Sequence, residues 1–141
     1  MSLILHIDTS GPEAWLVLAR DGQVLLTRRN NRQQDHAAFL HPAIRELMEE
    51  AGLQFAELAA VAVREGPGSY TGIRVGMAAA KGICFAAGIP LITLSALEIT
   101  ARALRDADAT VPVDDMPVCY CPMIDARRME VFTAVYDRSL Q

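Results

Sequence analysis

The stretch 65–74, Glu-Gly-Pro-Gly-Ser-Tyr-Thr-Gly-Ile-Arg, contains the residues of this chain that are most suited to chemistry. It follows a short apolar run at 58–63 and precedes a run of helical composition, which indicates a sharp turn from a strand into a helix. Unpaired backbone N–H groups at the start of a helix attract phosphate groups. The turn residues that could surround such an anion are Gly66, Gly68, Ser69, Thr71, Gly72 and Arg74.

The sequence of this turn does not match the common nucleotide-binding motifs. A P-loop requires Gly-Lys followed by Ser or Thr at the start of the helix, and this chain has Thr71-Gly72-Ile73 there. A dinucleotide-binding turn requires Gly-x-Gly-x-x-Gly, whereas Gly66, Gly68 and Gly72 include one residue too many. A structural turn without a bound nucleotide is therefore the favoured interpretation, because the first use of glycine is to permit backbone conformations that other residues disfavour.

The remaining reactive side chains do not form a recognisable catalytic or metal-binding pattern. His36 and His41 are five residues apart, which places them about 140° apart on a regular helix, so one metal ion cannot bind both. Cys119 and Cys121 have the wrong spacing for a Cys-x-x-Cys motif. Ser69 lacks the Gly-x-Ser-x-Gly setting of a hydrolase nucleophile. We therefore predict no catalytic residue and no metal site.

Composition is typical of one soluble domain with an acidic balance. The 141 residues are 52% hydrophobic and 21% charged, and the formal net charge is −4. Such a charge argues against binding nucleic acid through a broad basic surface of this chain alone. The longest apolar region, 83–94, is interrupted by Gly88 and Pro90 and is too short to span a bilayer. We therefore expect a cytoplasmic protein without a membrane contact.

The elements that would position these residues follow from hydrophobic periodicity and turn signals. Asp21-Gly22 between two apolar runs predicts a hairpin, and apolar residues at helical spacing after Asp35 predict an amphipathic helix that starts or bends at Pro42. The expected order is strands at 3–8, 14–19 and 24–27, a helix at 35–51, a strand at 58–63, a helix at 72–87, a strand at 91–93, a helix from Ser95, and a strand pair at 118–125 and 129–136. This order predicts a mixed sheet, with an antiparallel three-stranded meander and helices on its faces.

Colinear segments of the chain resemble the TsaB (YeaZ) family, bacterial proteins of the system that makes threonylcarbamoyladenosine in tRNA. The segments are 4–10, 65–76, the pair 87–91 and 94–98, and 124–127, which together extend over nearly the whole chain. The resemblance implies an α/β fold, an actin-like ATPase (ribonuclease-H-like) subdomain. We expect this subdomain at 1–106, a linker at 107–117 and the start of a second, truncated subdomain at 118–141.

The resemblance also implies a function, that of a non-catalytic scaffold. Family members dimerise with a TsaD-type transferase, a TsaE-type ATPase joins them, and tRNA is reached only through the complex. ATP would be used in that complex, with no cofactor of this chain's own, and a homodimer is expected when the chain is isolated. The two helices at 35–51 and 72–87 are then the docking surface. The interface residues expected from it are Leu40, Ala43, Leu47, Gly72, Gly76, Met77 and Ala80.

Two enzymatic alternatives stay open beside the scaffold. Actin-like ATPases carry their phosphate loops where this chain has Asp8-Thr9-Ser10 and Asp125, so these four residues are weak nucleotide candidates for an ATP-dependent kinase or nucleotide hydrolase. Both loops usually carry glycine, which Ser10 and Arg127 replace here, so a structural role for Asp8 competes with a metal or phosphate role. A glycoprotease-type peptidase is the least favoured alternative.

Overall fold

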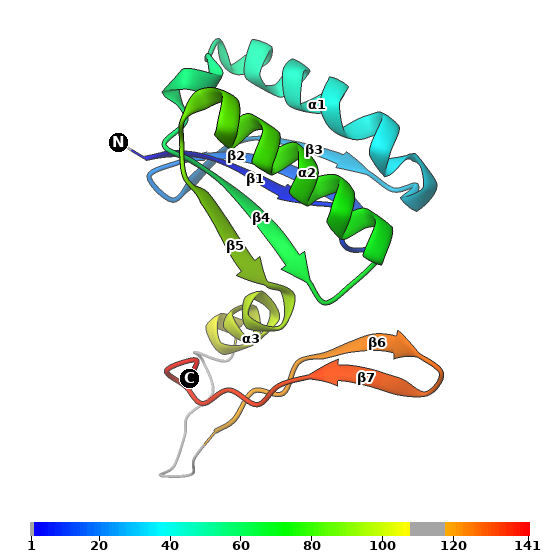
Figure 1. The fold of residues 1–141 in the computed structure, drawn as a ribbon. Helices are drawn as coiled ribbons and strands as arrows, with labels where there is room; N and C mark the ends of the chain where they lie inside the picture. The colour runs from blue at the N-terminus through cyan, green and yellow to red at the C-terminus, as the bar shows by residue number, and fades with distance from the viewer. Residues whose placement is uncertain (1, 108–117) are drawn as a thin grey trace.

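The computed structural model describes residues 2–107 and 118–141 and has a five-stranded mixed sheet at its centre (Figure 1). The strand order is β3-β2-β1-β4-β5. The strands of this sheet are β1 (Leu3–Asp8), β2 (Ala14–Arg20), β3 (Gln23–Asn30), β4 (Ala60–Gly66) and β5 (Leu91–Ser95). The helices are α1 (His36–Ala51), α2 (Tyr70–Ala87) and α3 (Ala96–Ala107), with short 3-10 turns at Gln33–Asp35 and Phe55–Glu57.

The first three strands form the expected antiparallel meander. Asp21 and Gly22 form the hairpin turn with φ angles of 50° and 82°, a geometry that fits the twist of the flanking strands. β1 then pairs in parallel with β4, and β4 pairs in parallel with β5. The predicted mixed sheet is confirmed.

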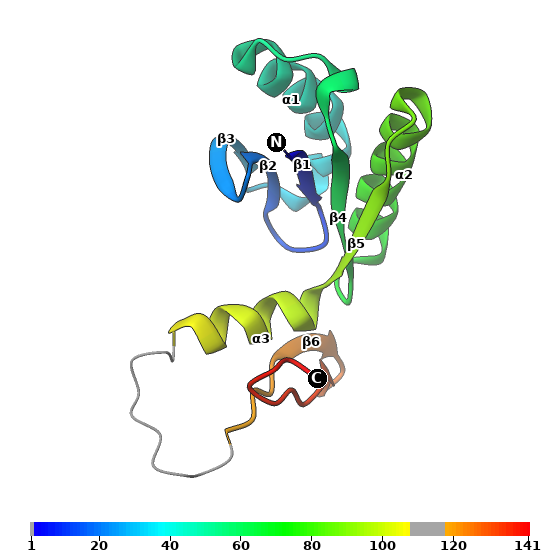
Figure 2. The same cartoon turned by 90° about the vertical axis from the view of Figure 1, so that its left-hand side faces the viewer.

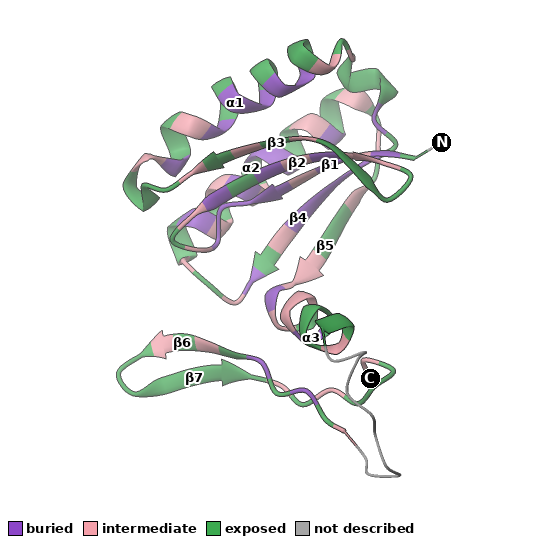
Figure 3. Ribbon diagram, turned by 180° about the vertical axis from the view of Figure 1, so that it is seen from behind, coloured by how far each residue is buried: buried purple, intermediate pink, exposed green. Residues whose placement is uncertain are grey.

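The hydrophobic core lies between one face of this sheet and the helices α1 and α2 (Figures 1 and 2). Alternate residues of β1 and β2, among them Leu5, Ile7 and Leu16, are fully buried against these helices. α3 lies away from them, beyond the carboxyl end of β5 and beside the strands β6 and β7 (Figures 1 and 2). Figure 3, seen from behind, shows that β1 and β4 are mostly buried, whereas β3 and β5 at the two edges of the sheet have only exposed and half-buried positions.

Two local expectations need adjustment. α1 begins at His36 and continues through Pro42, so the alternative in which the helix starts at Pro42 is wrong. The late strand pair is shorter than expected, with β6 at Met123–Arg127 and β7 at Glu130–Thr133, and an isolated bridge joins Tyr120 to Tyr136. The predicted linker at 107–117 lies outside the described residues except for Ala107, which ends α3.

The small-residue stripe of α2 packs inside this chain, contrary to its predicted role in an interface. Gly72 and Gly76 contact Thr9 at the end of β1, and Ala80 is fully buried. Leu40, Ala43 and Leu47 of α1 also belong to the core, so the expectation that these residues are exposed for docking is wrong. Met77 alone among the predicted interface residues stays partly exposed. The sheet covers these faces because Gly72 and Gly76 let the α2 backbone reach Thr9, and because the apolar side of α1 packs into the same core.

A pair of glycine substitutions in α2 tests this packing. A Cβ at Gly76 would collide with the Thr9 hydroxyl and lie 3.4 Å from Ile7 Cγ2, whereas a Cβ at Gly82 would meet nothing within 4 Å. We expect Gly76→Ala to lower the free energy of unfolding by about 1–3 kcal/mol, the usual cost of overpacking a core. Gly82→Ala should raise it by about 0.5–1 kcal/mol, because alanine favours the helix. Urea unfolding of both variants measures the difference, and equal stabilities would contradict the packing described here.

Candidate functional site

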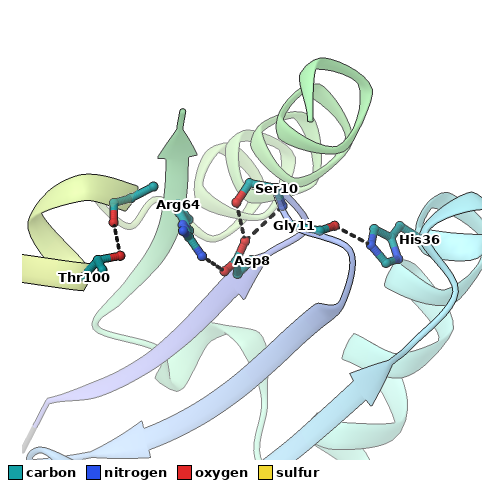
Figure 4. A network of polar contacts seen from close by, with 7 residues as sticks. Asp8, Ser10, Gly11, His36, Arg64 and Thr100 are labelled. Carbon is teal, nitrogen blue, oxygen red and sulfur yellow. Dashed lines mark hydrogen bonds and ion pairs between the residues drawn. The ribbon is translucent and has the colours of Figure 1, made fainter. Parts of the chain in front are cut away.

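Asp8, the first of the nucleotide candidates, lies buried at the end of β1 with both carboxylate oxygens engaged (Figure 4). Its Oδ2 accepts a hydrogen bond from Arg64 Nη1 of β4 at 2.8 Å. Its Oδ1 accepts hydrogen bonds from the Ser10 backbone N–H at 2.9 Å and from the Ser10 hydroxyl at 2.7 Å. The carboxylate is therefore the centre of an internal network that joins two parallel strands and the loop after β1.

This network fixes the charge of Asp8. Burial by itself raises the pKa of the Asp8 carboxyl, but the hydrogen bonds from Arg64 and Ser10 outweigh burial, so that the pKa lies below its ordinary value. Asp8 is thus ionised at neutral pH, and the Arg64 guanidinium neutralises it. A divalent cation would have to displace that guanidinium in order to bind.

The other nucleotide candidates are hydrogen-bonded within the chain, and they do not gather into a set of metal ligands. The Thr9 hydroxyl donates to the Gly72 carbonyl at 2.6 Å in the interior. Asp125 is exposed in the middle of β6, and its Oδ1 accepts from the Arg127 backbone N–H at 2.7 Å. Within 2–107 and 118–141, no group of three His, Cys, Asp or Glu residues could hold a metal ion. The residues present do not fit a magnesium–nucleotide site centred on Asp8.

The structure nevertheless places the glycine-rich turn after β4 and Asp125 of β6 along the same cleft. This cleft of about 870 Å³ lies between the strand-to-helix turn and the β6–β7 hairpin, and Ser10, Arg64, Gly68, Ser69, Thr71 and Asp125 are among its lining residues. A nucleotide site there stays a prediction.

The glycine-rich turn is held tightly against the loop after β1. A Cβ at Gly68 would lie 2.5 Å from the Ser10 carbonyl oxygen, and the Ser69 backbone N–H donates to that same oxygen at 2.7 Å. The Ser69 hydroxyl caps α2 by accepting from the Gly72 N–H at 3.3 Å. These contacts support the structural interpretation of the turn.

The two histidines of α1 have separate surroundings. His36 is buried, with Nε2 3.1 Å from the Gly11 carbonyl oxygen and Nδ1 3.1 Å from Asn30 Nδ2. His41 is exposed on the surface of the helix. A triad of Ser69, His36 and Asp8 is not formed, because each of the three has other hydrogen-bond partners.

A second candidate site is an apolar groove between α1 and α2, with a volume of about 760 Å³. Small side chains dominate its walls, so another helix can approach closely. The groove is lined by Ala37, His41, Phe55, Ala56, Val75, Ala78, Ala79, Gly82, Ile83, Ala86 and Ala87. The predicted pair of helices thus borders an open surface, although its residues differ from the predicted ones. A signal for it is present in the sequence, since Ala78, Gly82 and Ala86 form a second small-residue stripe at a spacing of four.

The strand order, with two helices packed on one face of the sheet, defines a ribonuclease H-like α/β subdomain. RuvC from Thermus thermophilus, solved with a Holliday junction substrate, shares this fold with a TM-score of 0.52 at 16% identity over 75% of this chain and 73% of that one. The family model described as TsaD, tRNA N6-adenosine threonylcarbamoyltransferase, matches residues 25–140. The chain belongs to the TsaB (YeaZ) family within this class.

Two relatives illustrate the similarity. The tRNA threonylcarbamoyladenosine biosynthesis protein TsaB of Bacillus subtilis is 32% identical over 133 residues, which cover 94% of this chain and 54% of that protein. YeaZ from Pseudomonas aeruginosa has a TM-score of 0.79 at 30% identity over 97% of this chain and 61% of that one. The chain spans about half the length of the curated TsaB relatives that it matches. None of the helices that the structure describes is long and apolar enough to cross a membrane.

Removing the counter-ion of Asp8 should destabilise the fold. Arg64→Met leaves a buried carboxylate unpaired, so we expect the free energy of unfolding at pH 7 to fall by about 3 kcal/mol. Adding Asp8→Asn to this variant should restore part of the loss, because the unpaired charge is then absent. Urea unfolding of the two single variants and the double variant measures the coupling. Strictly additive losses would show that Asp8 and Arg64 do not depend on each other.

The stability of this chain should fall in two steps on acidification. Burial and the nearby Arg64 lower the pKa of His6 below its ordinary 6.5, although Asp8 opposes them. The unfolded chain then binds a proton at His6 before the folded chain does, so stability falls as the pH drops below about 6.5. The lowered pKa of Asp8 gives a contribution that is complete above about pH 3.8 and is lost as the pH falls through the pKa of the folded state.

Urea midpoints between pH 7.5 and about pH 2 measure both steps. His6→Leu should flatten the upper step, Asp8→Asn should flatten the lower one, and His41→Gln, at an exposed position, serves as the control. An unchanged upper step in His6→Leu would contradict the assignment.

Proposed function

We propose that this chain is a non-catalytic scaffold that dimerises with a TsaD-type transferase in the formation of threonylcarbamoyladenosine in tRNA. The observation that carries the proposal is the open apolar groove between α1 and α2. It is formed by the only two helices that pack on the core face of the sheet within the described residues. A partner that removes such apolar surface from water forms a more stable complex, because burial of apolar surface is favourable.

The chemistry of the partner follows from the similarity of this chain to TsaD. The TsaD family model matches most of the chain, so a TsaD-type protein would present two helices equivalent to α1 and α2. Equivalent surfaces can pair about a pseudo-twofold axis, in which each groove receives the helices of the other protein. Ala78, Gly82 and Ala86 would allow close contact of the helix backbones along this axis.

The hydrogen bonding of the Asp8 carboxylate favours a scaffold over an enzyme. A magnesium-dependent kinase or nucleotide hydrolase needs carboxylate oxygens that are free to bind the metal. The Asp8 oxygens are bound by Arg64 and Ser10, which argues against this alternative. The reaction would take place in the transferase, with ATP and a TsaE-type ATPase joining the complex in the cytoplasm, and the isolated chain would form a homodimer through the same groove.

A charge placed in the groove tests the proposal. Ala78→Glu puts a carboxylate on the exposed groove wall, where burial by a partner would leave it unpaired. We expect the Kd for the TsaD-type protein of the same organism, measured by calorimetry, to rise at least about 100-fold, or about 2.8 kcal/mol. Gly82→Leu, which fills the groove with an apolar side chain, should also weaken the complex.

The matched control is Ala103→Glu, the same substitution at an exposed position of α3. It should leave the Kd unchanged. The urea midpoints of Ala78→Glu and Ala103→Glu should stay near that of the original chain, and the midpoint of Gly82→Leu should not fall below it. Binding of Ala78→Glu with an unchanged Kd, or a chain that binds no TsaD-type protein, would refute the proposed function.

A further inference from the structure

The helix α2 carries a second exposed surface beside the groove. Tyr70, Arg74, Met77, Lys81 and Phe85 follow one another at spacings of four, three, four and four residues, so they form one stripe, the aromatic–basic stripe. Tyr70 is 73% exposed and Phe85 93% exposed, and Arg74 and Lys81 are exposed between them. At about 100° per residue, the stripe lies roughly a quarter turn around the helix from the groove wall of Ala78, Gly82 and Ala86.

The stripe is basic although the chain as a whole is acidic. α2 contains no Asp or Glu from Tyr70 to Ala87, while the formal net charge of the chain is −4. In the part of the chain that the structure describes, no ion pair holds Arg74 or Lys81 within 4.0 Å of a carboxylate. Both cations are therefore available to an anionic partner.

The aromatic side chains give the stripe a second kind of contact. The Arg74 guanidinium lies over the Tyr70 ring at 5.5 Å from its centroid, and Nη1 donates to the Tyr70 hydroxyl at 3.3 Å. This pair presents a positive charge beside an aromatic ring at the amino end of α2. Phe85 presents an almost fully exposed ring at the other end, about 22 Å along the helix.

We propose that the aromatic–basic stripe binds the tRNA substrate, with Arg74 and Lys81 neutralising phosphates and with Tyr70 and Phe85 stacking on unpaired bases. This inference rests on the proposed function, because the RNA would bind to the complex with the transferase. Cations combined with exposed rings are the combination that single-stranded nucleic acid requires. An acidic protein as the partner would explain why Arg74 and Lys81 are exposed, but it would not explain why the ring of Phe85 is exposed as well.

The position of the stripe explains why the transferase is needed. A partner seated in the groove would leave the stripe a quarter turn away, at the rim of the contact, where RNA held by the transferase can reach it. Two phosphate contacts on an acidic chain give weak binding by themselves, since affinity for RNA rises with the number of phosphates that are neutralised. The complex would supply the remaining contacts.

The experiment uses the purified complex of this chain with the TsaD-type protein and a fluorescein-labelled tRNA that the complex modifies. Anisotropy gives the Kd at several KCl concentrations between 50 and 300 mM. For Arg74→Gln/Lys81→Gln we expect the slope of log Kd against log[KCl] to fall by about 1.4–1.8, the value for two lost phosphate contacts. Tyr70→Ala and Phe85→Ala should each raise the Kd about tenfold without changing the slope.

The matched control is Arg32→Gln/Arg102→Gln, which removes two exposed positive charges outside α2 and should leave the slope unchanged. Size-exclusion chromatography first establishes that each variant still forms the complex. If the original chain forms no complex, the proposed function fails and this inference fails with it.

If the complex forms but the stripe variants bind tRNA like the original chain, only this inference is overturned. If Arg74→Gln/Lys81→Gln loses the TsaD-type protein while Arg32→Gln/Arg102→Gln retains it, the stripe is a protein interface and the RNA inference is wrong.

Discussion

The close approach of α2 to the end of β1 is the constraint on which the rest of this structure depends. Gly72 and Gly76 bring the helix backbone into contact with Thr9, whose hydroxyl donates to the Gly72 carbonyl. This contact places the glycine-rich turn against Ser10 and sets the rotation of α2 about its axis. Because Gly72, Gly76 and Ala80 are turned toward the sheet, the groove wall and the aromatic–basic stripe are turned outward.

The same end of β1 carries an ion pair that decides what chemistry this region can perform. A buried carboxylate must be paired, protonated or bound to a metal, because an isolated charge in the interior is very unfavourable. In this chain Arg64 and Ser10 satisfy Asp8 from within the fold. The Asp8 carboxylate is therefore a structural link between β1, β4 and the following loop.

These two features together support the proposed scaffold, which would act through its surface. The interior of the subdomain is complete, with Leu40, Ala43 and Leu47 covering the sheet from α1. What is left open is the small-residue groove between α1 and α2, and beside it a stripe that combines cations with exposed rings. One helix thus presents two adjacent surfaces of different chemistry, which suits a scaffold that brings a protein and an RNA together.

The sequence by itself determined the elements of this fold, because apolar periodicity and turn residues such as Asp21-Gly22 act over a few neighbouring positions. It also excluded a P-loop and a shared metal for His36 and His41, since those conclusions need only local spacing. The rotation of the helices was decided by tertiary structure. α2 has small residues at 72, 76 and 80 and again at 78, 82 and 86, so its sequence is compatible with either side facing the sheet. The fit of Gly72 and Gly76 to Thr9 selects one of them, and this contact joins segments that are distant in sequence. The pairing of Asp8 with Arg64, 56 residues apart, was also decided by tertiary structure, because it forms only when β1 and β4 lie side by side.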